Sequence, residues 1–254
     1  MKTPFLFTAL FVGLLHVSFR ADAKILQQWS FEDDNPFQGL AIEGEPPKVV
    51  ADPQNPANKV MYSVLKPGAE RQERSEVKLN NVREGEERWV GVRILRPNAK
   101  QSGFTCFFQL GPIVGAKGHG GSGLYQLASY GKDGNNTWKI RGFMERAGGK
   151  GFGIPVGKVE YNKWEDWVFH IKVRADTSGL IEVWKNGQPV VKQTGQNAFP
   201  GDKVAIKWGV YVGKGNVPTD EITAFFDNIT IGDASSSMNE VAPRSAKSPS
   251  GGNP

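Results

Sequence analysis

The chain has 254 residues, a single cysteine and a formal net charge of +5 at pH 7. One cysteine excludes an internal disulfide, so the fold depends on a hydrophobic core, which a chain of this length can supply. The basic residues are dispersed, which argues against nucleic-acid binding. After the first 23 residues no apolar run is long enough to cross a bilayer.

Residues 1–23 have the features of a secretory signal peptide. Lys2 gives a positive start, an apolar run covers residues 5–17, and Ala21-Asp22-Ala23 matches the small-residue cleavage pattern. We therefore expect a protein that is secreted or periplasmic.

The rest of the chain shows short alternating segments between turn residues and no sustained helical period. Asn186-Gly187, for example, predicts a tight hairpin turn. Strands are expected at residues 24–32, 59–65, 74–79, 89–95, 104–110, 124–130, 137–143, 167–174, 180–185, 188–192, 204–212 and 221–231.

Three other segments are rich in loop-forming residues. Residues 33–57 are expected to be loop with room for one short strand, and residues 111–123 and 147–157 to be glycine-rich loops. Residues 233–254 contain almost no large apolar side chains and predict a disordered tail. The pattern therefore predicts one all-β domain over residues 24–232, a two-sheet sandwich or jelly roll.

The strand at 74–79 alternates charged and small or apolar residues. Arg74, Glu76 and Lys78 should share one face, because side chains at i, i+2 and i+4 point the same way in a strand. Two cations around a carboxylate could line a groove that holds an acidic ligand. The alternative is a solvated strand face with ordinary ion pairs.

Gln109 ends an aromatic strand beside Gly111-Pro112. Strict alternation places it on one face with Thr105 and Phe107, and places Cys106 on the other face as a small buried apolar side chain. Gln109 is a candidate for hydrogen bonding to a ligand, or else to loop backbone.

The strand at 204–212 places Lys207, Gly209 and Tyr211 on one face. A glycine between the two side chains would let a ligand approach the backbone. Cations near Tyr211 would lower its pKa from the usual value near 10, so the phenol could act as base or acid. The alternative is a tyrosine packed on the sheet with its hydroxyl in water.

Three segments, in this order, resemble the groove strands of jelly-roll polysaccharide lyases. Residues 74–78 (RSEVK) resemble their R-[ST]-E-x-[RK] strand, and residues 207–211 (KWGVY) resemble their K-A-G-[VI]-Y strand. Residues 108–111 (FQLG) are similar to their Q-x-H strand, with Gly111 in the place of the histidine. Residues 167–187 and 226–229 resemble the heparin lyase I-like and glucuronan lyase-like group.

The resemblance implies a β-jelly roll, a concanavalin-like two-sheet sandwich with a concave groove, that cleaves a uronate polysaccharide by β-elimination. In that chemistry the uronate carboxylate is neutralised, a base removes the C5 proton and an acid protonates the departing O4. Carried over by position, Gln109 and Arg74 would neutralise the carboxylate. Tyr211 would be the acid and is also a candidate base.

The same resemblance assigns supporting roles. Lys78 and Lys207 would hold substrate charge and favour the phenolate form of the tyrosine, and Glu76 would orient Arg74. Because Gly111 lacks the family's imidazole, His119 in the glycine-rich loop is a candidate replacement. His170, on a polar strand face with Lys172, ranks below it.

Two other functions stay open. A carbohydrate-binding module or inactive lyase would keep the basic groove and lack a working base. A jelly-roll glycoside hydrolase would need paired carboxylates across the scissile bond, and no strand carries their usual E-x-D-x-x-E pattern.

The partner we expect is an acidic polysaccharide, bound by a monomer without nucleic acid or membrane. No cofactor is expected. The one metal site that the sequence suggests is a weak structural calcium site at Asp33-Asp34-Asn35.

Overall fold

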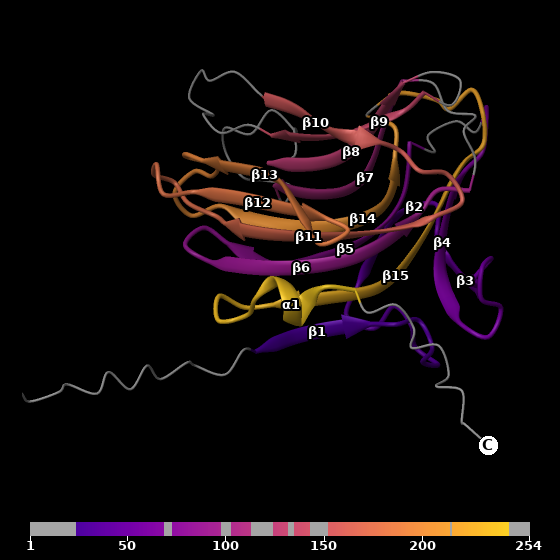
Figure 1. Ribbon diagram of the computed structural model, residues 1–254, viewed down its shortest axis with the longest axis horizontal. Helices are drawn as coiled ribbons and strands as arrows, with labels where there is room; N and C mark the ends of the chain where they lie inside the picture. The colour runs from indigo at the N-terminus through magenta and orange to yellow at the C-terminus, as the bar shows by residue number, and fades with distance from the viewer. Residues whose placement is uncertain are drawn as a thin grey trace, which may run out of the picture.

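The computed structural model describes residues 24–68, 73–97, 103–112, 124–131, 135–142, 152–213 and 215–243, and the signal-peptide expectation for residues 1–23 lies outside them. Over these ranges the chain forms two antiparallel sheets (Figure 1). This confirms the predicted all-β, two-sheet architecture. No helix in the described ranges is long and apolar enough to cross a membrane.

The eight-stranded sheet has the order β13-β12-β11-β6-β15-β4-β3, and β1 also pairs with β15. Its strands are β1 (Ile25–Trp29), β3 (Lys48–Ala51), β4 (Lys59–Leu65), β6 (Glu87–Leu95), β11 (Trp164–Lys172), β12 (Leu180–Lys185), β13 (Gln188–Thr194) and β15 (Ile222–Gly232).

The seven-stranded sheet has the order β10-β9-β8-β7-β14-β5-β2. Its strands are β2 (Ala41–Gly44), β5 (Arg74–Arg83), β7 (Gly103–Pro112), β8 (Tyr125–Gly131), β9 (Thr137–Gly142), β10 (Phe152–Lys158) and β14 (Lys203–Tyr211).

Aromatic side chains fill the space between the sheets. Phe108 on β7 stacks on Phe169 on β11, with ring centroids 4.1 Å apart. Trp208 on β14 packs against Trp29 on β1 at 5.4 Å. Such pairs add about 0.5–1.5 kcal/mol each to the burial of apolar area. Each sheet therefore turns one apolar face inward and leaves the other face for polar residues.

A β-bulge in β7 breaks the expected alternation. Cys106 pairs with Ala128 and Phe108 with Leu127, so Phe107 is the extra residue. Phe107 contacts Trp138 in the core, and its neighbour Phe108 also points into the core, where it contacts Phe169 of the other sheet. The prediction that Phe107 shares a face with Gln109 is therefore wrong, since the bulge resets the alternation between them.

Two loop predictions also need correction. Residues 33–57 hold two strands, β2 and β3, where one was expected, and β10 lies largely within the predicted loop 147–157. β10 contains Gly153, Pro155 and Gly157, residues that are typical of loops, so its sequence does not predict a strand. It is an edge strand, where proline is tolerated because one side of the backbone has no partner strand.

The domain continues beyond residue 232. The helix α1 (Met238–Val241) packs on β6 and β15, and Val241 is fully buried. A side chain at Gly91 would collide with the Val241 carbonyl oxygen, so glycine lets the helix approach β6. Figure 1 shows α1, in yellow, on the same side of the sandwich as β1. The predicted disordered tail is thus wrong for residues 233–243, and residues 244–254 lie outside the described ranges.

Candidate active site

The three strands singled out by sequence lie side by side in the seven-stranded sheet, in the order β7-β14-β5. Lys207 on β14 pairs with Lys78 on β5 and with Gln109 on β7. Tyr211 pairs with Arg74. We call the side of this sheet opposite the core, onto which these side chains project, the polar face.

Glu76 is completely buried below the polar face and connects two of the strands. Gln109 Nε2 donates a hydrogen bond of 2.7 Å to Glu76 Oε1, and Arg74 Nη1 lies 3.4 Å from Oε2. Because β14 separates β5 from β7, the Glu76 side chain must span that strand to reach Gln109, and its register partner on β14 is Gly209, which has no side chain. The role expected for Glu76, orienting Arg74, is thus extended to Gln109.

Gln126 on β8 completes the support of the Gln109 amide. Gln126 Nε2 donates to Gln109 Oε1 at 3.3 Å, and both side chains are almost buried. With one amide hydrogen on Glu76 and the oxygen held by Gln126, Gln109 has a second N–H that makes no hydrogen bond to the described residues. Sequence analysis missed Gln126, although a glutamine among apolar residues of a predicted strand was a usable signal.

Burial raises the pKa of Glu76 to about 7, against the lowering effects of the Arg74 charge and the Gln109 hydrogen bond. The carboxyl group therefore changes protonation near neutral pH. Above that pH it is an anion that fixes the Gln109 amide and attracts Arg74.

The basic side chains of the polar face converge on Glu43 of β2. Arg74 Nη1 and Lys207 Nζ lie 2.9 and 2.7 Å from Glu43 Oε2, and Lys78 Nζ lies 2.5 Å from Oε1. Burial opposes ionisation of Glu43, but the hydrogen bonds from the two lysines outweigh it and lower its pKa to about 2. Glu43 lies in a segment predicted to be mainly loop, so sequence analysis missed it.

Tyr211 lies at the end of β14 against two neighbours. The Arg74 guanidinium sits 4.3 Å from the centre of the tyrosine ring, and Phe104 on β7 meets that ring edge-on at 6.4 Å. Arg141 on β9 extends this group, since its guanidinium lies over Phe104 and donates to the Tyr130 hydroxyl. Tyr211 therefore lies beside a cation, as predicted.

Gly209 serves a different purpose from the one expected. Its φ of +141° is unfavourable for other residues, and a Cβ there would lie 2.2 Å from the Ser75 carbonyl oxygen. The close approach at Gly209 is therefore that of the neighbouring strand's backbone, and the expectation of ligand contact with its backbone has no support here.

Cys106 is buried beneath the polar face near Glu76. Burial first, and then the Glu76 charge, raise the pKa of its thiol well above the usual value. The expectation of a buried small apolar residue is confirmed, but the bulge places it on the side of β7 that carries Gln109.

The two candidate histidines have different outcomes. His119 lies outside the described residues, so its role stays a prediction. His170 is on β11 of the eight-stranded sheet, with Nδ1 2.7 Å from Glu182 and Nε2 2.6 Å from Glu87. Its neighbours Phe169 and Ile171 point into the core, so His170 faces outward on the other sheet. The structure therefore places His170 apart from the other candidates, on the sheet that does not carry the polar face.

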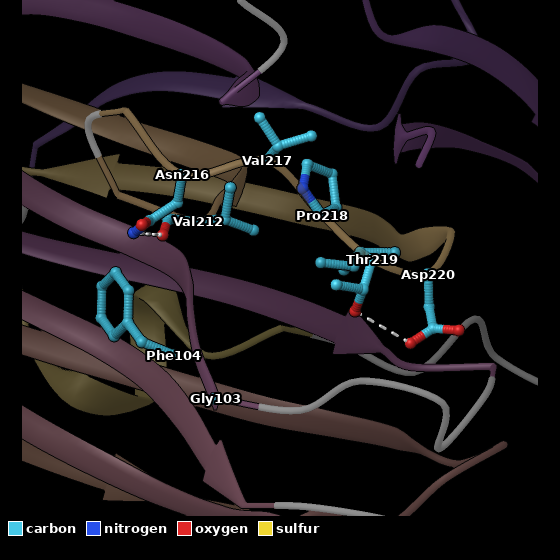
Figure 2. A pocket seen from close by; sticks show the side chains of 9 residues that line it. Gly103, Phe104, Val212, Asn216, Val217, Pro218, Thr219 and Asp220 are labelled. Carbon is cyan, nitrogen blue, oxygen red and sulfur yellow. Dashed lines mark hydrogen bonds between the residues drawn. The ribbon is translucent and has the colours of Figure 1, made fainter. Parts of the chain in front are cut away.

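A pocket of about 270 Å³ adjoins the Tyr211 end of the polar face. Figure 2 shows Phe104 on one side, Asn216 and Val217 opposite, and Thr219 hydrogen-bonded to Asp220 at 3.2 Å. Phe104 also contacts Tyr211, so the pocket and the tyrosine share a wall. The arrangement offers apolar surface and hydroxyl or amide groups next to the tyrosine.

Within the described residues, no group of three or more His, Cys, Asp or Glu side chains could hold a metal ion. The calcium site suggested at Asp33-Asp34-Asn35 stays a prediction.

Solved structures with the same fold include several lyases. An endo-β-1,4-glucuronan lyase from the fungus Trichoderma reesei matches with a TM-score of 0.66 and 15% identity, covering 88% of this chain and 100% of that one. An alginate lyase from Zobellia galactanivorans matches with a TM-score of 0.53 and 14% identity, covering 68% and 77%. The globular domain of T. cruzi calreticulin, at 0.55 and 11%, covers 86% and 91%. These likenesses show the fold.

No curated protein matches the chain in sequence. The family model described as polysaccharide lyase, however, matches residues 32–230, which is most of the chain and includes all three strands of the polar face. The chain therefore belongs to the polysaccharide lyase family and is a jelly-roll enzyme of that class.

Proposed function

We propose that the enzyme cleaves a uronate-containing polysaccharide by β-elimination on the polar face of the seven-stranded sheet. The observation that carries this proposal is the arrangement of Gln109, Glu76, Arg74 and Tyr211. One buried carboxyl group holds both the amide and the guanidinium, and the guanidinium lies on the tyrosine ring. An amide donor, a cation and a phenol then face one sugar.

Elimination requires stabilisation of the negative charge that develops on the uronate carboxyl group as C5 loses its proton. The second N–H of Gln109 belongs to an amide that Glu76 and Gln126 hold in place, so it needs no reorganisation when the charge forms. Lys207, the register partner of Gln109, adds positive charge nearby.

Tyr211 supplies the proton transfers. As phenolate it accepts the C5 proton, the C–H electrons form the C4–C5 double bond, and the C4–O4 bond breaks. The phenol then gives its proton to O4, which restores the phenolate. Arg74 at 4.3 Å from the ring centre favours the phenolate form.

A single residue that both removes and returns a proton must act on one face of the sugar. H5 and O4 share a face in D-glucuronate and D-mannuronate and lie on opposite faces in L-guluronate. We therefore propose glucuronan-like or mannuronan-like chains as substrates. The pattern of residues 1–23 supports secretion or export to the periplasm.

The test is incubation of the protein with glucuronan, polymannuronate, polyguluronate and heparin. A rise in ultraviolet absorbance from the C4–C5 double bond, on the first two polymers, is the expected result. New reducing ends without that absorbance would mean hydrolysis. Binding without any new ends would support the carbohydrate-binding alternative, which the missing imidazole at Gly111 favours.

A further inference from the structure

Glu43 occupies the centre of the cations that the polar face offers to an acidic ligand. Its two carboxylate oxygens contact Arg74, Lys78 and Lys207 at 2.5–2.9 Å. This is the distance of charge-assisted hydrogen bonds, so the three cations already hold one carboxylate of the protein itself.

The cluster has little charge left for a ligand. Besides Glu43, Glu73 lies 3.2 Å from Arg74 Nη2, and the third carboxyl group, Glu76, changes protonation near neutral pH. Counted over the described residues, two full negative charges and one partial charge thus face three cations. The remaining positive charge is about one unit or less.

The register of β2 and β5 explains why Glu43 is in this position. Glu43 pairs directly with Glu76, and like charges placed opposite each other in a sheet destabilise it unless cations intervene. β2 is a four-residue edge strand, and among the described strands it is hydrogen-bonded to β5 alone.

Solvent and ligands can reach this cluster. The side chains of Glu43, Arg74 and Lys78 are each 20–22% exposed. An anionic ligand must therefore bind to cations that already form ion pairs with Glu43.

We propose that Glu43 is a specificity-determining residue that limits the charge the site accepts. Glu43 lowers the net positive charge of the cluster to about the amount that one sugar carboxylate neutralises. It thereby disfavours binding of polysaccharides that carry sulfate groups in addition to carboxylates. The inference rests on the proposed function and names its substrate class as unsulfated polyuronates.

The experiment compares binding of heparin and of chemically desulfated heparin, which keeps the same uronate backbone. Wild type, Glu43→Gln and Glu160→Gln are measured by calorimetry at low and at physiological ionic strength. Glu160 forms an exposed ion pair with Lys163, so its substitution changes the net charge equally without touching the cluster.

We expect Glu43→Gln to increase the ratio of heparin affinity to desulfated-heparin affinity by about fivefold or more at low salt, and less at physiological salt. Glu160→Gln should leave the ratio at the wild-type value. Glu43→Asp keeps the charge and should also keep the ratio, and it guards against misfolding of the glutamine variant.

An unchanged ratio in folded Glu43→Gln, or an equal increase in Glu43→Asp, would overturn the proposal. Binding is measured without turnover, so this result is independent of the lyase assay. A wild-type protein that binds these chains but forms no unsaturated product would contradict the proposed elimination only.

Discussion

Gln109 on β7 and Glu76 on β5 are joined by a 2.7 Å hydrogen bond that spans β14, the strand between them. The bond connects an amide on the polar face to a carboxyl group completely buried beneath it. A neutral partner at this position would hold the amide less firmly, so we expect Glu76 to act through Gln109 as a positioning residue.

Replacing Glu76 by glutamine should therefore lower kcat roughly 10- to 100-fold, by analogy with the loss of groups that orient metal ligands. KM should change less, because the substitution leaves Gln109 and Arg74, the groups proposed to contact the polysaccharide, in the protein. Steady-state kinetics on the preferred polymer measures both values. An unchanged kcat in folded Glu76→Gln would show that the hydrogen bond has no part in the reaction.

Glu76 should also make stability depend on pH. Its pKa in the folded protein, about 7, is above the ordinary value of 4.5, so the folded state binds this proton more tightly than the unfolded state. The contribution is fully present below pH 4.5 and is lost as pH rises through 7, with a total of about 3 kcal/mol. Urea unfolding from pH 4.5 to 8 should show this loss in wild type and not in Glu76→Gln.

Gly209→Ala should destabilise the protein by roughly 1–3 kcal/mol or more, because a Cβ would collide with the Ser75 carbonyl oxygen at a positive φ. Gly111→Ala is the matched control. It lies in the neighbouring strand β7, its φ is ordinary, and Gln109 Oε1, at 4.0 Å, is the one described atom near the added carbon. Thermal melts should separate the two variants, and equal melting temperatures would contradict the close approach of β14 to β5.

The periodic strands of the sheet centres were predictable from sequence because their alternation is strong. This holds for β11, where Trp167, Phe169 and Ile171 all face the core, and for the polar face strands β5 and β14. Arg74, Lys207 and Tyr211 were identified in this way, and Gln109 by its place at the end of an aromatic strand beside Gly111-Pro112. Their proximity followed from the resemblance, since alternation alone does not give strand order.

Other features depend on tertiary structure that a local pattern does not record. The bulge at Phe107 adds one residue to β7 and reverses the faces before it, which alternation alone cannot show. Glu43 is a single carboxylate in a short edge strand. Its place in the site depends on ion pairs with three cations on two other strands, which the local sequence does not show. His170 has the same local pattern as a groove residue but belongs to the other sheet.

His170→Ala should reduce stability without reducing kcat. The imidazole bridges Glu87 and Glu182 and stacks on Trp89 at 3.9 Å, so its removal takes one hydrogen-bond partner from each carboxylate and leaves them with Lys172 and Lys192. We expect a loss of about 1–3 kcal/mol in the free energy of unfolding. Chemical unfolding and initial rates test the two halves of this prediction, and a large fall in kcat would return His170 to the candidates for catalysis.

In the proposed reaction Tyr211 carries out both proton transfers. The most direct measurement is kcat for Tyr211→Phe, read from the absorbance of the unsaturated product, with binding of the polymer measured in parallel. Tyr62→Phe, in β4 of the other sheet, is the control for loss of a hydroxyl. We predict that kcat falls about 10²- to 10⁴-fold in Tyr211→Phe while binding and the control stay near wild type. A Tyr211→Phe enzyme that keeps wild-type kcat would contradict the account.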